Sequence, residues 1–304
     1  MLRKYISGLV ILLLLCSNMS LLFANGSSDM AVLDKVALVE KFFGGTEQTG
    51  PLVERISKLE KEIWGKDIRG SLVARADKLY SYCRVNSENE PSFLIKMNAV
   101  EWTLTNMVTT EPVKLRIENL ERLLNGQVGT GPYENRLNQM LEYAYVAGTV
   151  TLTNVTVDKD NLLKIKLITP LSTRTSRPGD VVAFQIEEDI YIDGSLIIAK
   201  GAQGKGKVNK VEGSKNFGRD AQMEVSFDTV EAIDGSVIST LLGEKAKEEN
   251  KSVAIAAGAS FAGMVILGPI GIVGGAFVHG KEVTIPEGTT IYIQTQETSS
   301  LYGI

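Results

Sequence analysis

The first residue to consider for chemistry is His279, because it is the only histidine in the chain. It would have to serve as the base of any Ser-His-Asp relay, yet no Gly-x-Ser-x-Gly turn is present to supply the serine. A zinc site would need carboxylates in place of the missing histidine and cysteine ligands. We therefore interpret His279 as an interfacial residue. We predict no catalytic residue, no metal site and no cofactor, and hence a protein that is not an enzyme.

The segment Gly201–Val208, rich in glycine and lysine, nearly fits a phosphate-binding loop. That loop requires Ser or Thr after its lysine to hold magnesium, and a helix behind it. Val208 stands where the hydroxyl should be, and the surrounding sequence is typical of strands. The sequence therefore predicts no nucleotide partner.

Two carboxylate clusters could bind a cation or perform acid–base chemistry. In Glu187–Asp189, neighbouring side chains on a strand would point to opposite faces and could not converge on one ligand. Asp158–Asn161 has oxygen ligands of the kind calcium prefers, but it lacks the turn glycine and the distal glutamate of a calcium loop. We interpret both clusters as solvated turns.

The overall charge argues against a nucleic-acid partner. The formal net charge is −4, and no basic block provides the electrostatic footprint that nucleic acid requires. Hydrophobic residues make up 44% and charged residues 22% of the chain, as in a folded globular protein.

The N-terminus is typical of an exported protein. Arg3 and Lys4 precede a short apolar run, and the sequence turns polar after Ala24. This pattern predicts a signal peptide over residues 1–24 and a linker over 25–31. The alternatives are an uncleaved anchor helix and lipidation at Cys16. Cleavage would leave Cys83 as the single thiol, which we interpret as a buried structural cysteine.

Residues 32–146 contain an internal duplication. Glu40 and Glu101 are 61 residues apart, and the same offset relates Arg55 to Arg116. Matches at this many positions predict a helical-repeat domain. The other pairs at this offset are Pro51 and Pro112, Leu59-Glu60 and Leu120-Glu121, Gly65 and Gly126, and Arg75 and Arg136.

Each copy contains two shorter units that open with Pro or Ser, carry an arginine and continue with apolar residues at helical spacing. The arginine precedes Leu or Met by four residues, so both lie on one helix face. The arginines could form a row that faces a partner. Alternatively, they lie over the helix seam and pair with Glu54, Glu60 or Glu121. These arginines are Arg55, Arg75, Arg116 and Arg136. Similar units occur in uncharacterised exported bacterial proteins.

From residue 147 to residue 304 the sequence has the period of β-strands. Short alternating runs rich in β-branched residues are separated by turn signals. Asp193-Gly194 and Asp234-Gly235 predict type I′ hairpin turns. The fold class is therefore α+β: a helical repeat followed by a small antiparallel β-barrel or sandwich.

An apolar stretch interrupts this β-domain. Residues 253–278 carry no charge, and Gly268-Pro269 near the middle breaks a helix. A strand-like run follows, so we predict a helical hairpin that returns the chain to its own sheet. The hairpin could enter a membrane, contact another subunit, or pack internally. Small residues would let its arms approach closely. The residues assigned to this contact are Gly258, Gly263, Gly268, Pro269, Gly271 and Gly275.

The order of these features resembles the C-terminal barrel of the TrbI-like scaffold subunits of conjugation and type IV secretion core complexes. The resemblance rests on Ile198–Gly201, Ile233–Gly235, the apolar run and Ile285–Thr289, and it covers about the last 130 residues. In that family a hairpin inserted in the barrel enters the outer membrane. The resemblance thus implies a barrel with a membrane-inserting hairpin, although the N-terminal half departs from the family.

These observations predict a structural or scaffolding protein of a diderm bacterial envelope, located in the periplasm or outer membrane. Its expected partners are a membrane and an envelope protein or a second copy of the chain. The alternative is a soluble periplasmic ligand-binding module with a buried hairpin.

Overall fold

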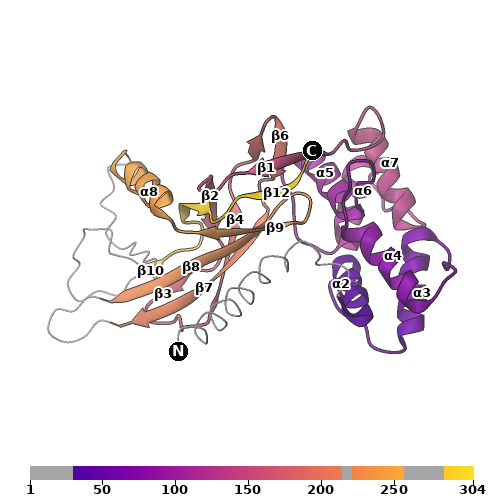
Figure 1. Ribbon diagram of the computed structural model, residues 1–304, viewed down its shortest axis with the longest axis horizontal. Helices are drawn as coiled ribbons and strands as arrows, with labels where there is room; N and C mark the ends of the chain where they lie inside the picture. Colours follow the sequence, from indigo (N-terminus) through magenta and orange to yellow (C-terminus); the bar gives the residue numbers. More distant parts are fainter. Residues whose placement is uncertain (1–29, 214–220, 257–283) are drawn as a thin grey trace, which may run out of the picture.

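A computed structural model describes residues 30–213, 221–256 and 284–304. In Figure 1 a group of short helices stands at one end of the molecule and a β-barrel occupies the rest. No helix among the described residues is both long enough and apolar enough to cross a membrane.

Six helices of nearly equal length form the helical unit. Each helix of the first three has a counterpart 61 residues later, for example Val32 and Phe93 at the first positions of two helices. The duplication therefore repeats a bundle of three helices. The helices are α2 (Val32–Gly44), α3 (Leu52–Trp64), α4 (Leu72–Arg84), α5 (Phe93–Thr105), α6 (Val113–Asn125) and α7 (Tyr133–Ala144).

The ends of these helices follow from the sequence. Pro51 and Pro112 stand at N-caps in extended conformation, and the Ser71 hydroxyl accepts a hydrogen bond from Ala74 N–H. Gly65 and Gly126 end their helices in the left-handed conformation that glycine adopts without strain. The four predicted units are α3, α4, α6 and α7.

The sequence pattern did not mark α2 and α5, which lack the arginine. In α5 the apolar residues Phe93, Leu94, Ile95 and Met97 are all buried, although they point in different directions around the helix. This helix lies between the other helices and the barrel, so it has no clear polar face. Phe93 and Met97 belong to the core of the helical unit, while Leu94 packs towards the barrel.

Six antiparallel strands close the barrel in the order β11-β2-β4-β7-β8-β9. Their alternate residues are buried, and Phe184 and Phe227 meet edge to face inside at 5.5 Å between ring centroids. The barrel strands are β2 (Leu162–Leu167), β4 (Val181–Ile186), β7 (Gln203–Glu212), β8 (Gln222–Glu231), β9 (Val237–Leu241) and β11 (Thr290–Thr295).

Short strand pairs extend the barrel. The α+β fold with a barrel confirms the predicted class. The pairs are β1 (Thr153–Val157) with β12 (Ser299–Gly303), β3 (Leu171–Ser172) with β10 (Thr284–Ile285), and β5 (Ile190–Ile192) with β6 (Ser195–Ile198).

The strand β11 closes the barrel after the apolar stretch, as predicted. Thr290 pairs with Lys166 of β2, and Gln294 pairs with Leu241 of β9. The chain therefore returns to its own sheet. The hairpin itself, with Gly258, Gly263, Gly268, Pro269, Gly271 and Gly275, lies outside the described residues, and so does His279.

One of the two predicted type I′ turns is confirmed and the other is wrong. Asp193 and Gly194 both have positive φ, 51° and 83°. At the second turn only Gly235 has positive φ, 84°. Asp234 instead caps a wider loop, since its carboxylate accepts hydrogen bonds from the backbone N–H groups of Ser236 and Tyr302.

The charged run after Gly243 begins helix α8 (Glu244–Ala256). Ala246 is fully buried, and Asn250 holds both backbone polar groups of Tyr292 on β11. The helix is therefore fixed to the barrel. It lies, with β10, at the end away from the helical unit (Figure 1).

Candidate interaction site

Four buried ion pairs link successive helices of the unit. Each joins an arginine near the start of one helix to a glutamate 15 residues earlier, near the end of the preceding helix. The shortest distances between Nη2 and the carboxylate are 2.6 to 2.7 Å. The pairs are Arg55–Glu40, Arg75–Glu60, Arg116–Glu101 and Arg136–Glu121.

Each of these glutamates also accepts a hydrogen bond from a backbone N–H eight residues later in the sequence. One carboxylate therefore fixes the end of its helix, the following loop and the next helix together. The donors are the N–H groups of Gln48, Ile68, Thr109 and Gly129.

The four arginines therefore do not form an exposed row in the described structure. Their side chains are at most 11% exposed and turned into the bundle. Two of the three glutamates considered from the sequence, Glu60 and Glu121, are partners, whereas Glu54 lies on the exposed side. The arginine spacing thus serves helix packing.

The pair of Arg136 and Glu121 changes the acidity of the carboxyl. Burial alone raises the pKa of Glu121, but hydrogen bonds from Arg136 and from Gly129 N–H outweigh it and leave the pKa below the ordinary 4.5. The hydrogen bond to Glu121 raises the pKa of Arg136. Both groups are therefore charged in the folded protein.

Replacing Glu121 by Gln should destabilise the protein most at neutral pH. Because the folded pKa is lower than the unfolded one, the stabilisation is complete above the unfolded pKa and disappears as the pH falls through the folded pKa. The stability difference between E121Q and the original protein should therefore shrink below the ordinary pKa of 4.5. Urea titrations at neutral and acid pH measure it. A difference as constant with pH as that of the exposed control Glu54→Gln would contradict the expectation.

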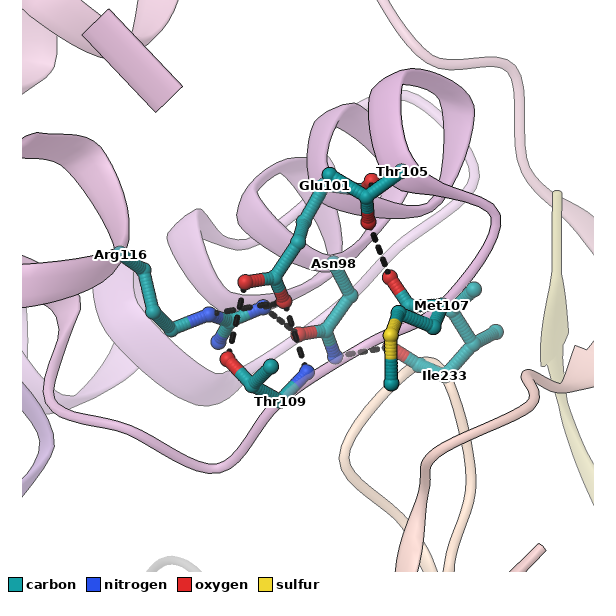
Figure 2. A network of polar contacts seen from close by, with 7 residues as sticks. All are labelled: Asn98, Glu101, Thr105, Met107, Thr109, Arg116 and Ile233. Carbon is teal, nitrogen blue, oxygen red and sulfur yellow. Dashed lines mark hydrogen bonds and ion pairs between the residues drawn. The ribbon is translucent and has the colours of Figure 1, made fainter. Parts of the chain in front are cut away.

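The ion pair between Glu101 on α5 and Arg116 on α6 also belongs to a network that connects the helical unit to the barrel (Figure 2). Arg116 Nη2 donates to Glu101 at 2.6 Å and to Asn98 Oδ1 at 2.7 Å. Asn98 Nδ2 in turn donates to the backbone oxygen of Ile233 at 2.8 Å. Thr109 donates its hydroxyl to Glu101 from the other side. A single network thus connects three segments of the helical unit to the loop after β8.

Further polar contacts surround this network at the junction of the two parts. Trp102 Nε1 donates to Asp189 at 3.0 Å, and Val108 N–H donates to the oxygen of Lys200 at 2.9 Å. Asn86 Nδ2 donates to the oxygen of Asp234 at 2.8 Å. The bonds to Lys200 and Asp234 use backbone oxygens on the barrel side, so they require a close fit.

Glycine makes that close fit possible at two positions. A Cβ on Gly235 would lie 2.2 Å from Leu94 Cδ2, and one on Gly201 would lie 2.4 Å from the oxygen of Val108. Both glycines have positive φ. The barrel loops therefore approach the helices more closely than a side chain would allow.

A cleft of about 130 Å³ opens beside the network. Its floor is apolar and includes Leu94, Ala202 and Ile233, and its rim carries charged residues of both signs, such as Arg84 and Glu111. It could admit one side chain of a partner or a small ligand. No group of three or more His, Cys, Asp or Glu residues in the described part of the chain is arranged to hold a metal ion.

Replacing Asn98 by Ala should loosen the junction without unfolding the helices. The backbone oxygen of Ile233 would lose its partner in a buried site, at a cost of about 1–3 kcal/mol. Amide exchange at Ala232–Ser236 should become about 5- to 150-fold faster, the factor that corresponds to this cost. Hydrogen exchange measures this. Equal rates in N98A and in the exposed control Asn119→Ala would contradict a coupling role for Asn98.

The remaining candidates from the sequence have structural partners. Glu187 accepts from the Thr290 hydroxyl, Glu188 pairs with Lys164, and Asp189 binds Trp102. These three acidic side chains therefore have separate partners. Cys83 is buried, and burial raises the pKa of its thiol.

The glycine-rich segment that resembles a phosphate loop belongs to β7. Gly204 and Gly206 point into the barrel, where a Cβ on Gly204 would lie 2.0 Å from the Phe184 ring. Gly204 therefore makes room for the Phe184 ring, whereas Gly206 allows the close approach of the β8 backbone.

Sequence reasoning missed Asn98, Trp102 and Asn86. A signal existed at two of these positions. At the offset of 61 residues, Asn98 corresponds to Ala37, and Trp102 corresponds to Lys41. At these two positions a difference between the copies coincides with a contact to the barrel.

No family model matches the chain, and no curated protein matches it. Among solved structures, the chain is similar to ComB10 of the Com type IV secretion system of Helicobacter pylori, with 17% identity and a TM-score of 0.27. The match covers 47% of this chain and 88% of that chain.

Proposed function

We propose that this protein is a non-enzymatic scaffold of the bacterial cell envelope. In this proposal the helical unit binds an envelope partner and the barrel carries the apolar segment 253–278 to a membrane. The junction between the helical unit and the barrel supports this proposal. Asn98, Trp102 and Asn86 bind the barrel through hydrogen bonds of 2.8 to 3.0 Å, so the two parts are held as one body.

The position of the insertion supports the same proposal. Helix α8 leads into the apolar segment and β10 follows it, and both lie at the end of the barrel away from the helices (Figure 1). The two expected contacts are thus at opposite ends of the molecule. A rigid connection between separate contact sites is what a scaffold requires.

Cell fractionation tests the membrane contact. The full chain should sediment with membranes and require detergent for release. A variant with residues 257–278 replaced by a short Gly-Ser linker should remain in the soluble fraction. Its circular dichroism spectrum should lose only the helical signal of the segment, and its thermal unfolding should stay cooperative. A full chain that stays soluble without detergent would contradict the membrane contact.

The cleft at the junction favours a second candidate, a soluble periplasmic ligand-binding module with a buried hairpin. In that case the linker variant should misfold, because the core would lose a packed element. Its circular dichroism spectrum therefore separates the two candidates.

A further inference from the structure

A cationic face lies on the outside of the barrel where β4 and β7 pair. Its members are Arg177, Val181, Lys205 and Lys207, all of them exposed. Lys207 lies opposite Val181 across the strand pair, and Lys205 is two residues away on the same side of β7. We call these four residues the cationic face.

Among the residues that the structure describes, Lys205 and Lys207 differ from nearby lysines in forming no ion pair. Lys164 is paired with Glu188, and Lys210 with Glu212 at 2.7 Å. None of the carboxylates in the described part of the chain forms an ion pair with Lys205 or Lys207. The chain as a whole is acidic, with a net charge of −4, so this concentration of positive charge is local.

The arginine of the face is held in place by its turn. Arg177 Nη1 donates to three carbonyl oxygens of its own loop, at 3.1 to 3.3 Å. The turn is joined to β7, since Gly179 N–H donates to Val208 and Val208 N–H donates to Asp180. The Asp180 carboxylate accepts from Arg177 N–H. The charge of Arg177 is therefore fixed on the turn that is hydrogen-bonded to β7 next to Lys207.

An exposed valine lies within this face. Val181 is 63% exposed, and the lysine side chains beside it have long apolar stems below their ammonium groups. An apolar side chain surrounded by such cations fits the boundary between lipid headgroups and acyl chains. An acidic protein surface would not require the valine.

The position of the face suggests the same ligand. Strand β10, which follows the apolar segment, pairs with β3, and β3 precedes Arg177 by only five residues (177 − 172). Figure 1 shows β3 and β10 at the end away from the helices. Val181, Lys207 and Arg177 therefore lie next to the strand pair at which the chain returns from the apolar segment, because Ser176 N–H donates to Ser172 of β3. Lys205 lies two residues further along β7 towards the helical unit.

We propose that the cationic face binds the headgroups of anionic phospholipids. This inference rests on the proposed function, because both place this end of the barrel at a membrane. It adds a requirement for lipid charge that an apolar insertion alone does not have. Each lysine near an anionic membrane surface increases affinity by about fivefold, so the two together contribute roughly 25-fold.

Vesicle flotation tests the proposal with the full chain made by cell-free synthesis in the presence of vesicles. The vesicles contain phosphatidylcholine alone or with phosphatidylglycerol. The lipid concentration that floats half of the protein should be lower with phosphatidylglycerol, and high salt should remove the difference. In Lys205→Gln/Lys207→Gln that concentration should rise by roughly 25-fold on anionic vesicles only. The control Lys58→Gln/Lys66→Gln changes the same charge at exposed positions of the helical unit, on α3 and in the loop after it.

The outcomes separate this inference from the proposed function. Equal binding to both vesicle types, unchanged in Lys205→Gln/Lys207→Gln, would overturn the cationic face and leave the apolar contact supported. Binding only to anionic vesicles, released by salt, would support the face and contradict insertion. Binding to a DNA duplex with the same loss in the double variant, and none to anionic vesicles, would also overturn the lipid proposal.

Discussion

Replacing Arg116 by Ala should cost about 3–5 kcal/mol of unfolding free energy, because it leaves a buried carboxylate without its cation. Glu101 is 5% exposed and would keep only its bonds to Thr109. Asn98 would lose the donor that fixes its oxygen. We therefore expect both the helical unit and the junction to weaken.

Tryptophan fluorescence during urea titration measures this effect in the helical unit, since both tryptophans, Trp64 and Trp102, are located there. Arg122→Ala is the matched control. Its side chain is 53% exposed and pairs with Glu118 one turn away, so it should change stability by less than about 1 kcal/mol. A loss in R116A no larger than in the control would show that the buried pair is not needed for stability.

Replacing Gly206 by Ala should disrupt the barrel. A Cβ there would lie 1.9 Å from the backbone oxygen of Ser226 and 3.0 Å from Phe227 Cα. Backbone cannot move aside as a flexible side chain can, so β7 and β8 would have to separate. Overpacking of this kind costs about 1–3 kcal/mol, and the lost ladder bonds add to it.

Hydrogen exchange in β8, together with thermal unfolding followed by circular dichroism, measures this change. Gly213 is the control, because a Cβ there would meet no atom within 4 Å and its φ is not positive. Gly213→Ala should leave the melting temperature unchanged. Equal melting temperatures for G206A and G213A would contradict the expectation that the barrel requires the close approach of β7 to β8. The tryptophan signal should report intact helices in either variant.

The sequence predicted the elements whose signals are local. Pro or Ser at a helix start and Gly65 or Gly126 at a helix end act within one turn of the chain. The alternating strands of the barrel and the Asp193-Gly194 turn likewise depend on residues close together in the sequence. The return of β11 to the barrel was also predicted, because an unpaired last strand would be unfavourable.

Elements were missed where distant contacts override the local pattern. Strand β7 contains Gly204 and Gly206, which have low strand propensity. The Phe184 ring on β4 explains Gly204, and the close backbone of β8 explains Gly206. Helix α5 has no clear polar face because it is covered on two sides. Asp234 leaves the expected turn geometry because it accepts from Tyr302 N–H.

The candidate site was predicted least well. The arginines were found, and Glu60 and Glu121 were considered as their partners. Glu40 and Glu101 were known only as matching positions of the duplication. That each arginine would reach the glutamate 15 residues earlier depends on how successive helices turn back on one another. Helix period alone does not give that direction.

The repeated ion pairs and the attachment to the barrel depend on different residues. Glu40 and Glu101 make the same bonds in both copies, whereas Asn98 and Trp102 are particular to the second copy. The number of three-helix modules could therefore change during evolution while the docking surface stays intact. The length of the helical unit and its attachment to the barrel can thus change independently. Chains with different numbers of modules would then span different distances from the same junction.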